Sequence, residues 1–156
     1  MTTQRTEPRM KTRTGTIALF GSLLVFAALS AVAAERPYRE GTVSQVAAIR
    51  TQPGMFDAYM QYLATTYKQV MEQQKAAGLV VDYRVYSTVP RGPNDPDLYL
   101  VVVYKNMAAL DDLRDKMEPI QQKTFGDDAQ RSAKAIERGK LRTQLGSELM
   151  RELILK

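Results

Sequence analysis

The stretch VVDYRVYSTVPRGPNDPDLYLVVVYKN, residues 80–106, is the most informative part of this chain about its architecture. Two runs rich in valine and tyrosine, Val80–Thr88 and Leu98–Lys105, alternate apolar and polar side chains as β-strands do. The loop between them, Pro90–Asp97, contains prolines and a glycine and cannot continue either strand. The stretch therefore predicts a hairpin of two antiparallel strands.

The two faces of this hairpin differ in character if Arg84 lies opposite Val101. One face is then nearly all apolar and needs a helix to cover it; it comprises Val81, Tyr83, Val85, Leu100, Val102 and Tyr104. The other face mixes apolar and charged side chains, namely Asp82, Arg84, Tyr86, Tyr99, Val101, Val103 and Lys105. A shift of one residue would exchange the faces, so the prediction depends on the register.

The segment before the hairpin predicts a strand and then a helix. Thr42–Thr51 is rich in β-branched and small residues, and Pro53 and Gly54 end it. From Met55 the apolar residues recur at steps of three and four, as on one face of a helix that ends at Gly78. That face comprises Phe56, Tyr59, Met60, Leu63, Tyr67, Val70, Met71 and Gln74.

The segment after the hairpin predicts a second helix, a third helical segment and a last strand. Asn106 is a typical N-cap, and we expect Pro119 to kink or break the helix that follows. Acidic residues are expected near the start of this helix, where the helix dipole favours them: Asp111, Asp112 and Asp115. Its buried face is expected to comprise Leu110, Leu113, Met117 and Ile120. A more polar helix, Asp127–Leu141, carries a thin apolar stripe of Ala129, Ala133 and Ile136, and Ser147–Lys156 is expected to be a strand.

This order of elements, β-α-β-β-α-β, predicts an α+β protein with a ferredoxin-like sandwich: a four-stranded antiparallel sheet with helices on one face. Residues 42–156 resemble the dimeric α/β-barrel superfamily. The resemblance rests on the order of elements and on two segments, RTQPGMFDAYMQYL (residues 50–63) and YKNMAALDDL (residues 104–113), followed by a closing strand. That group includes antibiotic-biosynthesis monooxygenase-like, NIPSNAP-like and stress-responsive barrel domains. The resemblance implies a homodimer whose two sheets face each other.

The mixed face of the hairpin suits such a contact. We expect a dimer interface formed by Asp82, Arg84, Tyr86, Tyr99, Val101 and Val103. Enzymes of the superfamily often use a histidine as haem ligand or general base. This chain contains no histidine, so no catalytic residue carries over from the resemblance.

Cysteine is absent as well as histidine, and this removes several kinds of chemistry. Disulfides, thiolate nucleophiles, and metal sites built on thiolate or imidazole are excluded. The acidic residues Asp95 and Asp97 in the hairpin loop miss the spacing of a calcium loop, and a solvated turn explains them better. We therefore expect no metal and no cofactor.

The charge of the chain is concentrated at its start. The net charge is +5, and residues 1–34 hold four of the 22 basic residues but one of the 17 acidic residues. The remaining 18 basic and 16 acidic side chains are interspersed in residues 35–156. A nucleic-acid partner calls for clustered basic residues, so none is expected.

Residues 1–34 have the pattern of a secretory signal peptide. A basic start is followed by the uncharged stretch Ile17–Ala34, which ends in small residues. Cleavage there leaves residues 35–156 as a periplasmic or secreted domain. The alternative is an uncleaved membrane anchor, because the apolar stretch is about long enough to cross a bilayer.

All eight tyrosines lie after residue 34. One interpretation is packing, with the rings buried and the hydroxyls hydrogen-bonded at the edge of the core. The other is a pocket for a small, mostly apolar or aromatic ligand, with Arg50 or Arg84 orienting a carboxylate. The candidate ligand-binding residues are Arg50, Tyr59, Tyr83, Arg84, Tyr86 and Tyr104.

Three functions follow from these observations. The leading hypothesis is an exported dimeric domain that binds a small molecule or a partner protein. The alternative is a cofactor-independent enzyme, monooxygenase-like or isomerase/cyclase-like, that acts on a small aromatic compound with tyrosine and arginine as proton donors or orienting groups. A structural or stress-related envelope protein is the third.

Overall fold

The computed structural model describes residues 35–156, and the expected signal peptide of residues 1–34 lies outside the described residues. The elements follow the order β1 (Tyr38–Thr51), α1 (Phe56–Tyr62), η1 (Leu63–Tyr67), α2 (Lys68–Ala76), β2 (Asp82–Ser87), β3 (Leu98–Tyr104), η2 (Met107–Leu110), α3 (Leu113–Phe125), α4 (Asp128–Leu141) and β4 (Arg142–Leu155). Among these described elements, no helix is both long and apolar enough to cross a membrane.

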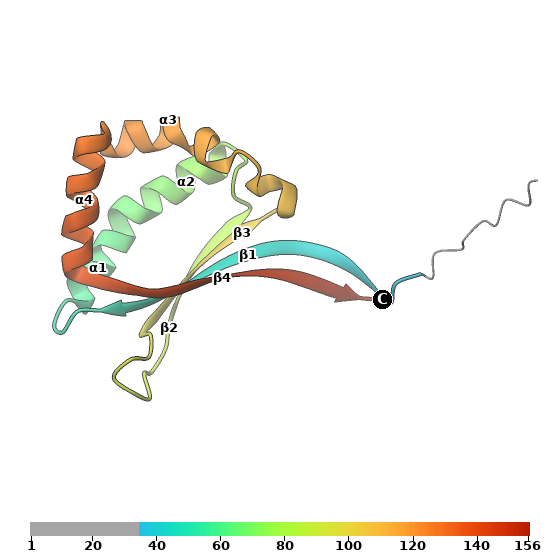
Figure 1. Ribbon diagram of the computed structural model, residues 1–156, viewed down its shortest axis with the longest axis horizontal. Helices are drawn as coiled ribbons and strands as arrows, with labels where there is room; N and C mark the ends of the chain where they lie inside the picture. Colours follow the sequence, from blue (N-terminus) through green and yellow to red (C-terminus); the bar gives the residue numbers. More distant parts are fainter. Residues whose placement is uncertain (1–34) are drawn as a thin grey trace, which may run out of the picture. The chain divides into compact units, whose positions relative to one another are not determined.

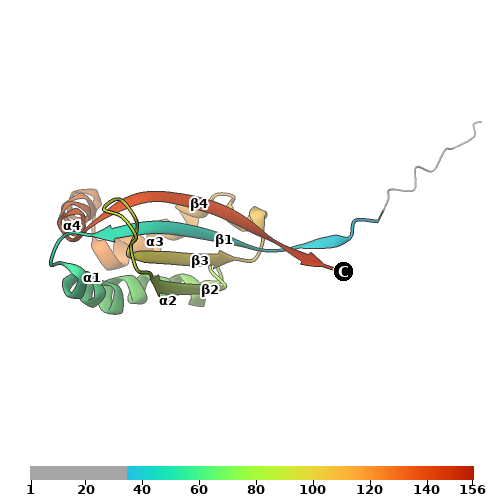
Figure 2. The ribbon, with the colours of Figure 1, turned by 90° about the horizontal axis from the view of Figure 1, so that it is seen from below.

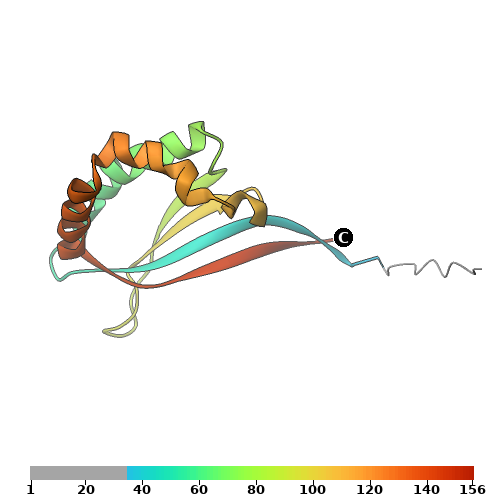
Figure 3. The same ribbon diagram turned by 45° about the horizontal axis from the view of Figure 1, so that its top comes forward.

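The four strands form one antiparallel sheet in the order β2-β3-β1-β4. Figure 2 shows the strands side by side in this order. The helices of the domain all lie on one side of the sheet (Figures 1 and 3). This is the predicted ferredoxin-like arrangement, with α4 added between α3 and the last strand.

The hairpin has the register that the sequence predicted. Arg84 pairs with Val101, and β3 in turn pairs with β1, where Val46 lies opposite Val101. Because side chains alternate along a strand, Leu98, Leu100 and Tyr104 point to the helices and are buried. Tyr99, Val101 and Val103 therefore lie on the opposite face of the sheet.

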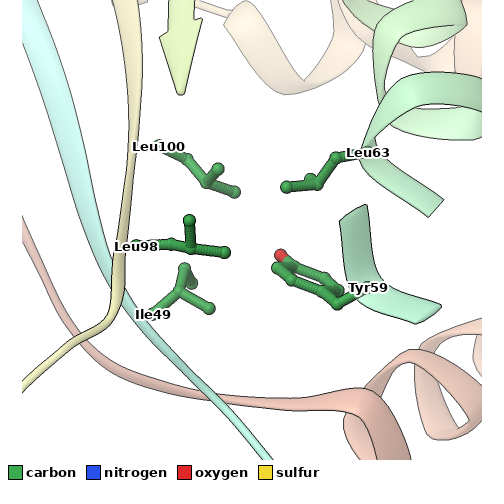
Figure 4. Close-up of a cluster of buried hydrophobic side chains, with 5 residues drawn as sticks. All are labelled: Ile49, Tyr59, Leu63, Leu98 and Leu100. Carbon is green, nitrogen blue, oxygen red and sulfur yellow. The ribbon is translucent and has the colours of Figure 1, made fainter. Parts of the chain in front are cut away.

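The main core joins the first helical run to the centre of the sheet. Ile49, Leu98 and Leu100 from the sheet meet Tyr59 and Leu63 from the helices, as Figure 4 shows. A second cluster comprises Val43, Val80 and Tyr104. Burying each such side chain stabilises the fold by about 1.5–3 kcal/mol. The main cluster fixes the first helical run on β1 and β3, and the second fixes η2 and the start of α3.

The predicted first helix is one continuous run of α1, η1 and α2. Its middle, η1, is a π-helical turn, and there the Thr65 hydroxyl donates to the Gln61 carbonyl oxygen at 2.8 Å. The run ends at Gly78, which has φ of 71°. The Gly78 amide donates to the Lys75 carbonyl and the Leu79 amide to the Gln74 carbonyl, each at 3.0 Å. These are the two bonds of a Schellman motif, which confirms the predicted glycine cap.

The second half of the helical layer differs from the prediction in three respects. Asn106 caps only the short 3-10 helix η2, and α3 starts after a break at Asp111 and Asp112. Pro119 was expected to kink or break the second helix; α3 continues through it, so no break occurs there. Pro119 and Asp115 are both exposed, so water can replace the amide hydrogen that the Asp115 carbonyl oxygen lacks at position 119. The apolar stripe of α4 faces solvent: Ala129 and Ala133 are exposed, and Ile136 is 64% exposed.

Arginines face inward from α4 in place of that stripe. Arg131 pairs with Glu118 of α3 at 2.7 Å, and Arg138 donates to the Tyr62 hydroxyl at 3.1 Å. These polar contacts determine which face of α4 turns toward the domain. The periodicity of the sequence had predicted that the face with Ala129, Ala133 and Ile136 would turn inward. Asp127, where this helix was expected to start, is its N-cap, with a complete capping box to Gln130.

The outer strand pair is longer than the sequence indicates. Strand β1 begins at Tyr38 instead of Thr42, and β4 begins at Arg142 instead of Ser147. Paired residues run from Tyr38 with Leu155 to Thr51 with Arg142, whereas the pairs of β1 with β3 begin only at Val43. Backbone pairing therefore extends both strands into segments whose side chains carry little β-propensity.

Gly78→Ala should lower the free energy of unfolding by about 1 kcal/mol, because an alanine at a positive φ is strained. Gly139→Ala is the matched control. Gly139 lies inside α4 with nothing within 4 Å of an added Cβ, so alanine there should stabilise by about 0.5–1 kcal/mol. Urea unfolding of both variants measures the two effects, and equal effects of the same sign would contradict the assigned cap.

Candidate functional site

The sheet face without helices is the first candidate site, and we call it the open face. All six residues of the predicted interface lie on it: Asp82, Arg84, Tyr86, Tyr99, Val101 and Val103. Val46 of β1 lies beside Val101 and extends the apolar centre. Within residues 35–156, no helix covers this face (Figures 1 and 3).

Charges border the open face along its β2 edge. The Arg84 guanidinium donates from Nε to Asp82 Oδ2 at 3.1 Å and from Nη1 to the Tyr86 hydroxyl at 3.5 Å. The Tyr83 backbone amide and the Arg84 guanidinium hold the pKa of Asp82 below its usual range. Such exposed pairs add little stability. They place an ordered polar border beside an apolar centre, as is typical of an interface.

A second candidate site lies between the sheet and the outer helices, and we call it the sheet–helix cavity. Its volume is about 630 Å³. Gln45 and Tyr104 contribute from the sheet, and the Tyr104 hydroxyl donates to Gln45 Oε1 at 3.4 Å. The helices contribute Leu113, Arg114, Met117, Glu118, Gln121, Asp128, Arg131 and Ser132.

Most charges in the sheet–helix cavity pair with one another. Arg131 pairs with both Glu118 and Asp128. The hydrogen bond from Arg131 holds the pKa of Glu118 below its usual range, so this carboxylate stays ionised beside its partner. The amides, hydroxyls and apolar side chains then remain for a ligand. Arg114 is the remaining cation of the lining, and with it the two arginines balance the two carboxylates. The cavity therefore suits a small, uncharged molecule with polar groups.

A third hollow, the interhelical groove, lies on the helical layer between the first helical run and α4, beside the end of α3. Its volume is about 590 Å³. Apolar and aromatic side chains line its base, and they are Met55, Tyr62, Phe125 and Leu141. Lysine and arginine side chains of α4 line its rim.

The six predicted ligand-binding residues divide between the two faces of the sheet. Tyr59, Tyr83 and Tyr104 lie on the helix side, where Tyr104 lines the sheet–helix cavity. Arg50, Arg84 and Tyr86 point to the open face and cannot orient a ligand in either hollow. Sequence reasoning missed the contributions of α3 and α4, because their polar side chains have no motif spacing.

The tyrosines on the helix side form a connected group. Tyr59 stacks on Tyr62 with ring centroids 5.9 Å apart, and Tyr67 packs edge-on against Tyr83 at 6.0 Å. The hydroxyl of Tyr67 is buried and has no hydrogen-bond partner among residues 35–156. Both interpretations of the tyrosines thus apply in part, since most of them pack, while Tyr104 lines the sheet–helix cavity and Tyr62 the interhelical groove.

The phenol pKa values in this group are raised. Burial raises the pKa of Tyr59, Tyr67 and Tyr104. The Tyr83 hydroxyl donates to Glu72 Oε1 at 2.6 Å, and that bond raises the pKa of Tyr83 to about 12. All four groups stay neutral at physiological pH. Tyr83 and Tyr104 already donate their single O–H groups, to Glu72 and Gln45. None of the four phenols is suited to abstract a proton near neutral pH.

Comparison of this structure with solved structures shows a similarity of fold. In structure, the chain resembles dimeric ferredoxin-like proteins. A dimeric ferredoxin-like protein from an uncultured marine organism matches with a TM-score of 0.48 and 12% identity, over 76% of this chain and 98% of that one. HapK from Hahella chejuensis matches with a TM-score of 0.47 and 10% identity, over 70% and 91%. The protein SO0527 from Shewanella oneidensis matches with a TM-score of 0.46 and 16% identity, over 75% and 96%. No protein-family model and no curated protein matches the sequence.

Alkaline titration followed by tyrosinate absorbance should show late-ionising phenols in the folded protein. Tyr59, Tyr67, Tyr83 and Tyr104 should ionise above the ordinary value of about 10. Since the unfolded chain releases these protons more easily, the free energy of unfolding should fall as the pH rises from about 10 toward 12. Glu72→Gln should move the Tyr83 ionisation back toward lower pH. A single midpoint shared by the native and the denatured protein would contradict this assignment.

Proposed function

We propose that this chain is an exported homodimeric binding domain, in which two sheets pack through their open faces and the sheet–helix cavity of each subunit holds a small molecule. The observation that carries the proposal is the open face itself. Its apolar centre of Val46, Val101 and Val103 lies under no helix of the described chain. Apolar patches of this kind mark interaction surfaces.

A second copy of the same chain is the partner that this face suits best. Both signs of charge occur on it, with Arg84 beside Asp82 and with Glu148 of β4 opposite Val46. Two-fold symmetry brings such a mixed surface against itself, so that the arginine of one subunit can meet a carboxylate of the other. Charge pairs at the border then specify the register of the contact more than they add stability.

The sheet–helix cavity supports the small-molecule part of the proposal. Its volume of about 630 Å³ is within the range of ligand pockets, and its neutral polar groups include Gln45, Gln121 and Ser132. Burial raises the pKa of Tyr104 and keeps its hydroxyl neutral, so that it forms a neutral hydrogen-bonded pair with Gln45 at the cavity wall. These features favour binding over the alternative of a cofactor-independent enzyme, which needs a group that exchanges protons near neutral pH.

The export part of the proposal is supported by the basic start, the uncharged stretch Ile17–Ala34 and its alanine-rich end. Cleavage there places the domain in the periplasm or outside the cell. Retention of that segment instead attaches the same domain to the membrane. The dimer contact is the same in both cases, because it uses only residues 35–156.

Val101→Glu should weaken the dimer strongly, because an unpaired carboxylate becomes buried at the contact. We expect the dissociation constant to rise by about a hundredfold, which corresponds to about 2.7 kcal/mol. Light scattering or sedimentation across a micromolar concentration series of the purified protein measures the change.

Ile136→Glu is the matched control for that experiment. It places the same charge on the outward surface of α4, where Ile136 is 64% exposed. The dimer should persist in this variant. A monomeric wild-type protein at micromolar concentration, or a dimer equally stable in both variants, would contradict the proposal.

A further inference from the structure

The interhelical groove combines an apolar base with cations that have no carboxylate partner. Tyr62 comes from α1, Phe125 from the end of α3, and Lys134, Arg138 and Leu141 from α4. Helix α1 and helix α4 are far apart in the sequence, and α1 lies beside α4 in Figures 1 and 3. The groove is formed by helical-layer residues and is independent of the open face.

The charges at the groove do not cancel. Glu137 pairs with Lys140 at 2.6 Å, and this pair neutralises itself. Lys134 and Arg138 form no ion pair within residues 35–156. They are four residues apart on one helix, so both side chains project from the same face of α4. The groove therefore presents two adjacent positive charges.

Neutral groups hold both cations in place. The Lys134 ammonium donates to the carbonyl oxygens of Thr124 at 3.4 Å and Phe125 at 3.2 Å, and it lies 5.6 Å from the centre of the Phe125 ring. Arg138 donates from Nη1 to the Tyr62 hydroxyl oxygen at 3.1 Å. A guanidinium has five N–H groups, so Arg138 retains donors for a further acceptor.

Tyr62 adds a third donor at the same place. Its oxygen accepts from Arg138, which leaves its own O–H to donate. The ring is held by its stacking on the buried Tyr59, at an interplanar angle of 11°. Arg142 increases the positive potential behind this pair: Arg142 and Arg138 both oppose the effect of burial on the pKa of Tyr59.

We propose that the interhelical groove binds an amphipathic carboxylate: an anion with a carboxylate head and an aliphatic or aromatic body. The carboxylate lies between Arg138, Lys134 and the Tyr62 hydroxyl, where a guanidinium and a carboxylate can form paired charge-assisted hydrogen bonds. The apolar body lies along Met55, Phe125 and Leu141. This site goes beyond the proposed dimer and its uncharged ligand, because it uses a different hollow and a different ligand chemistry.

Calorimetry with three probes that share one alkyl chain tests the head-group requirement. The probes are decanoate, 1-decanol and decyltrimethylammonium, each titrated into the purified protein near pH 7.5 at low salt. We expect saturable binding of decanoate, and affinities at least about tenfold lower for the alcohol and the cation, which lose the charge-assisted bonds. Equal binding of all three, or no binding of decanoate at millimolar concentration, overturns the proposal.

Variants then locate the site. Arg138→Gln should lower decanoate affinity at least about tenfold, Lys134→Gln several-fold, and Arg138→Lys less than Arg138→Gln because one charge is retained. Arg114→Gln is the matched control, since it removes an exposed cation that lines the sheet–helix cavity instead. Thermal melting of each variant without ligand establishes that it is folded. Loss of affinity in Arg114→Gln with none in Arg138→Gln places the anion in the other cavity and overturns the assignment.

Discussion

The pairing of β3 between β1 and β2 is the constraint on which the rest of this structure depends. Arg84 lies opposite Val101, and Val101 lies opposite Val46, so one alternation of side chains runs across three strands. Every even-numbered residue of β3 then points to the helices. A shift of one residue would place Leu98 and Leu100 in solvent and bring Tyr99 and Val101 under the helices. The buried cluster around Tyr59 and Leu63 forms only in the observed register.

The same alternation leaves the second face of the sheet without cover. All helical elements of the described chain are used on one side, where they form both the core and the two hollows. A dimer through the open face and ligand sites on the helical side are therefore compatible. The outer parts of the helical layer are held mainly by polar contacts: α3 and α4 contain no side chain that is fully buried. Such weakly packed helices are suited to adjust around a bound molecule.

Much of this architecture could be predicted from the sequence, because the signals are local. The alternation of side chains along the hairpin predicted its two strands and which residues share a face. A single glycine, Gly78, predicted the end of the first helical run. The prediction failed where tertiary contacts override local preference. Helix α3 continues through the exposed Pro119. The face of α4 that points inward is determined by the contacts of Arg131 with Glu118 and of Arg138 with Tyr62.

The candidate sites were less predictable than the fold for a related reason. Tyr104 was found from its residue type and its strand, but Arg84 and Tyr86 lie on the other side of the sheet from it. The groove residues Lys134 and Arg138 are typical of a solvated helix when only the sequence is considered. They become a site because the packing of α4 brings them beside Tyr62 and Phe125, which are distant along the chain.

The concentration dependence of thiol labelling tests the central claim, that the alternation of β3 creates a self-associating face. The chain has no cysteine, so the variants Val101→Cys and Val102→Cys each carry one thiol. The two positions are adjacent in β3, and their side chains point to opposite faces of the sheet. The account predicts that the thiol at position 101 is protected at high protein concentration and reacts faster on dilution. The thiol at position 102, on the helix side, should react at one rate throughout. A rate at position 101 that does not depend on concentration, or a dependence at position 102 instead, would contradict the account.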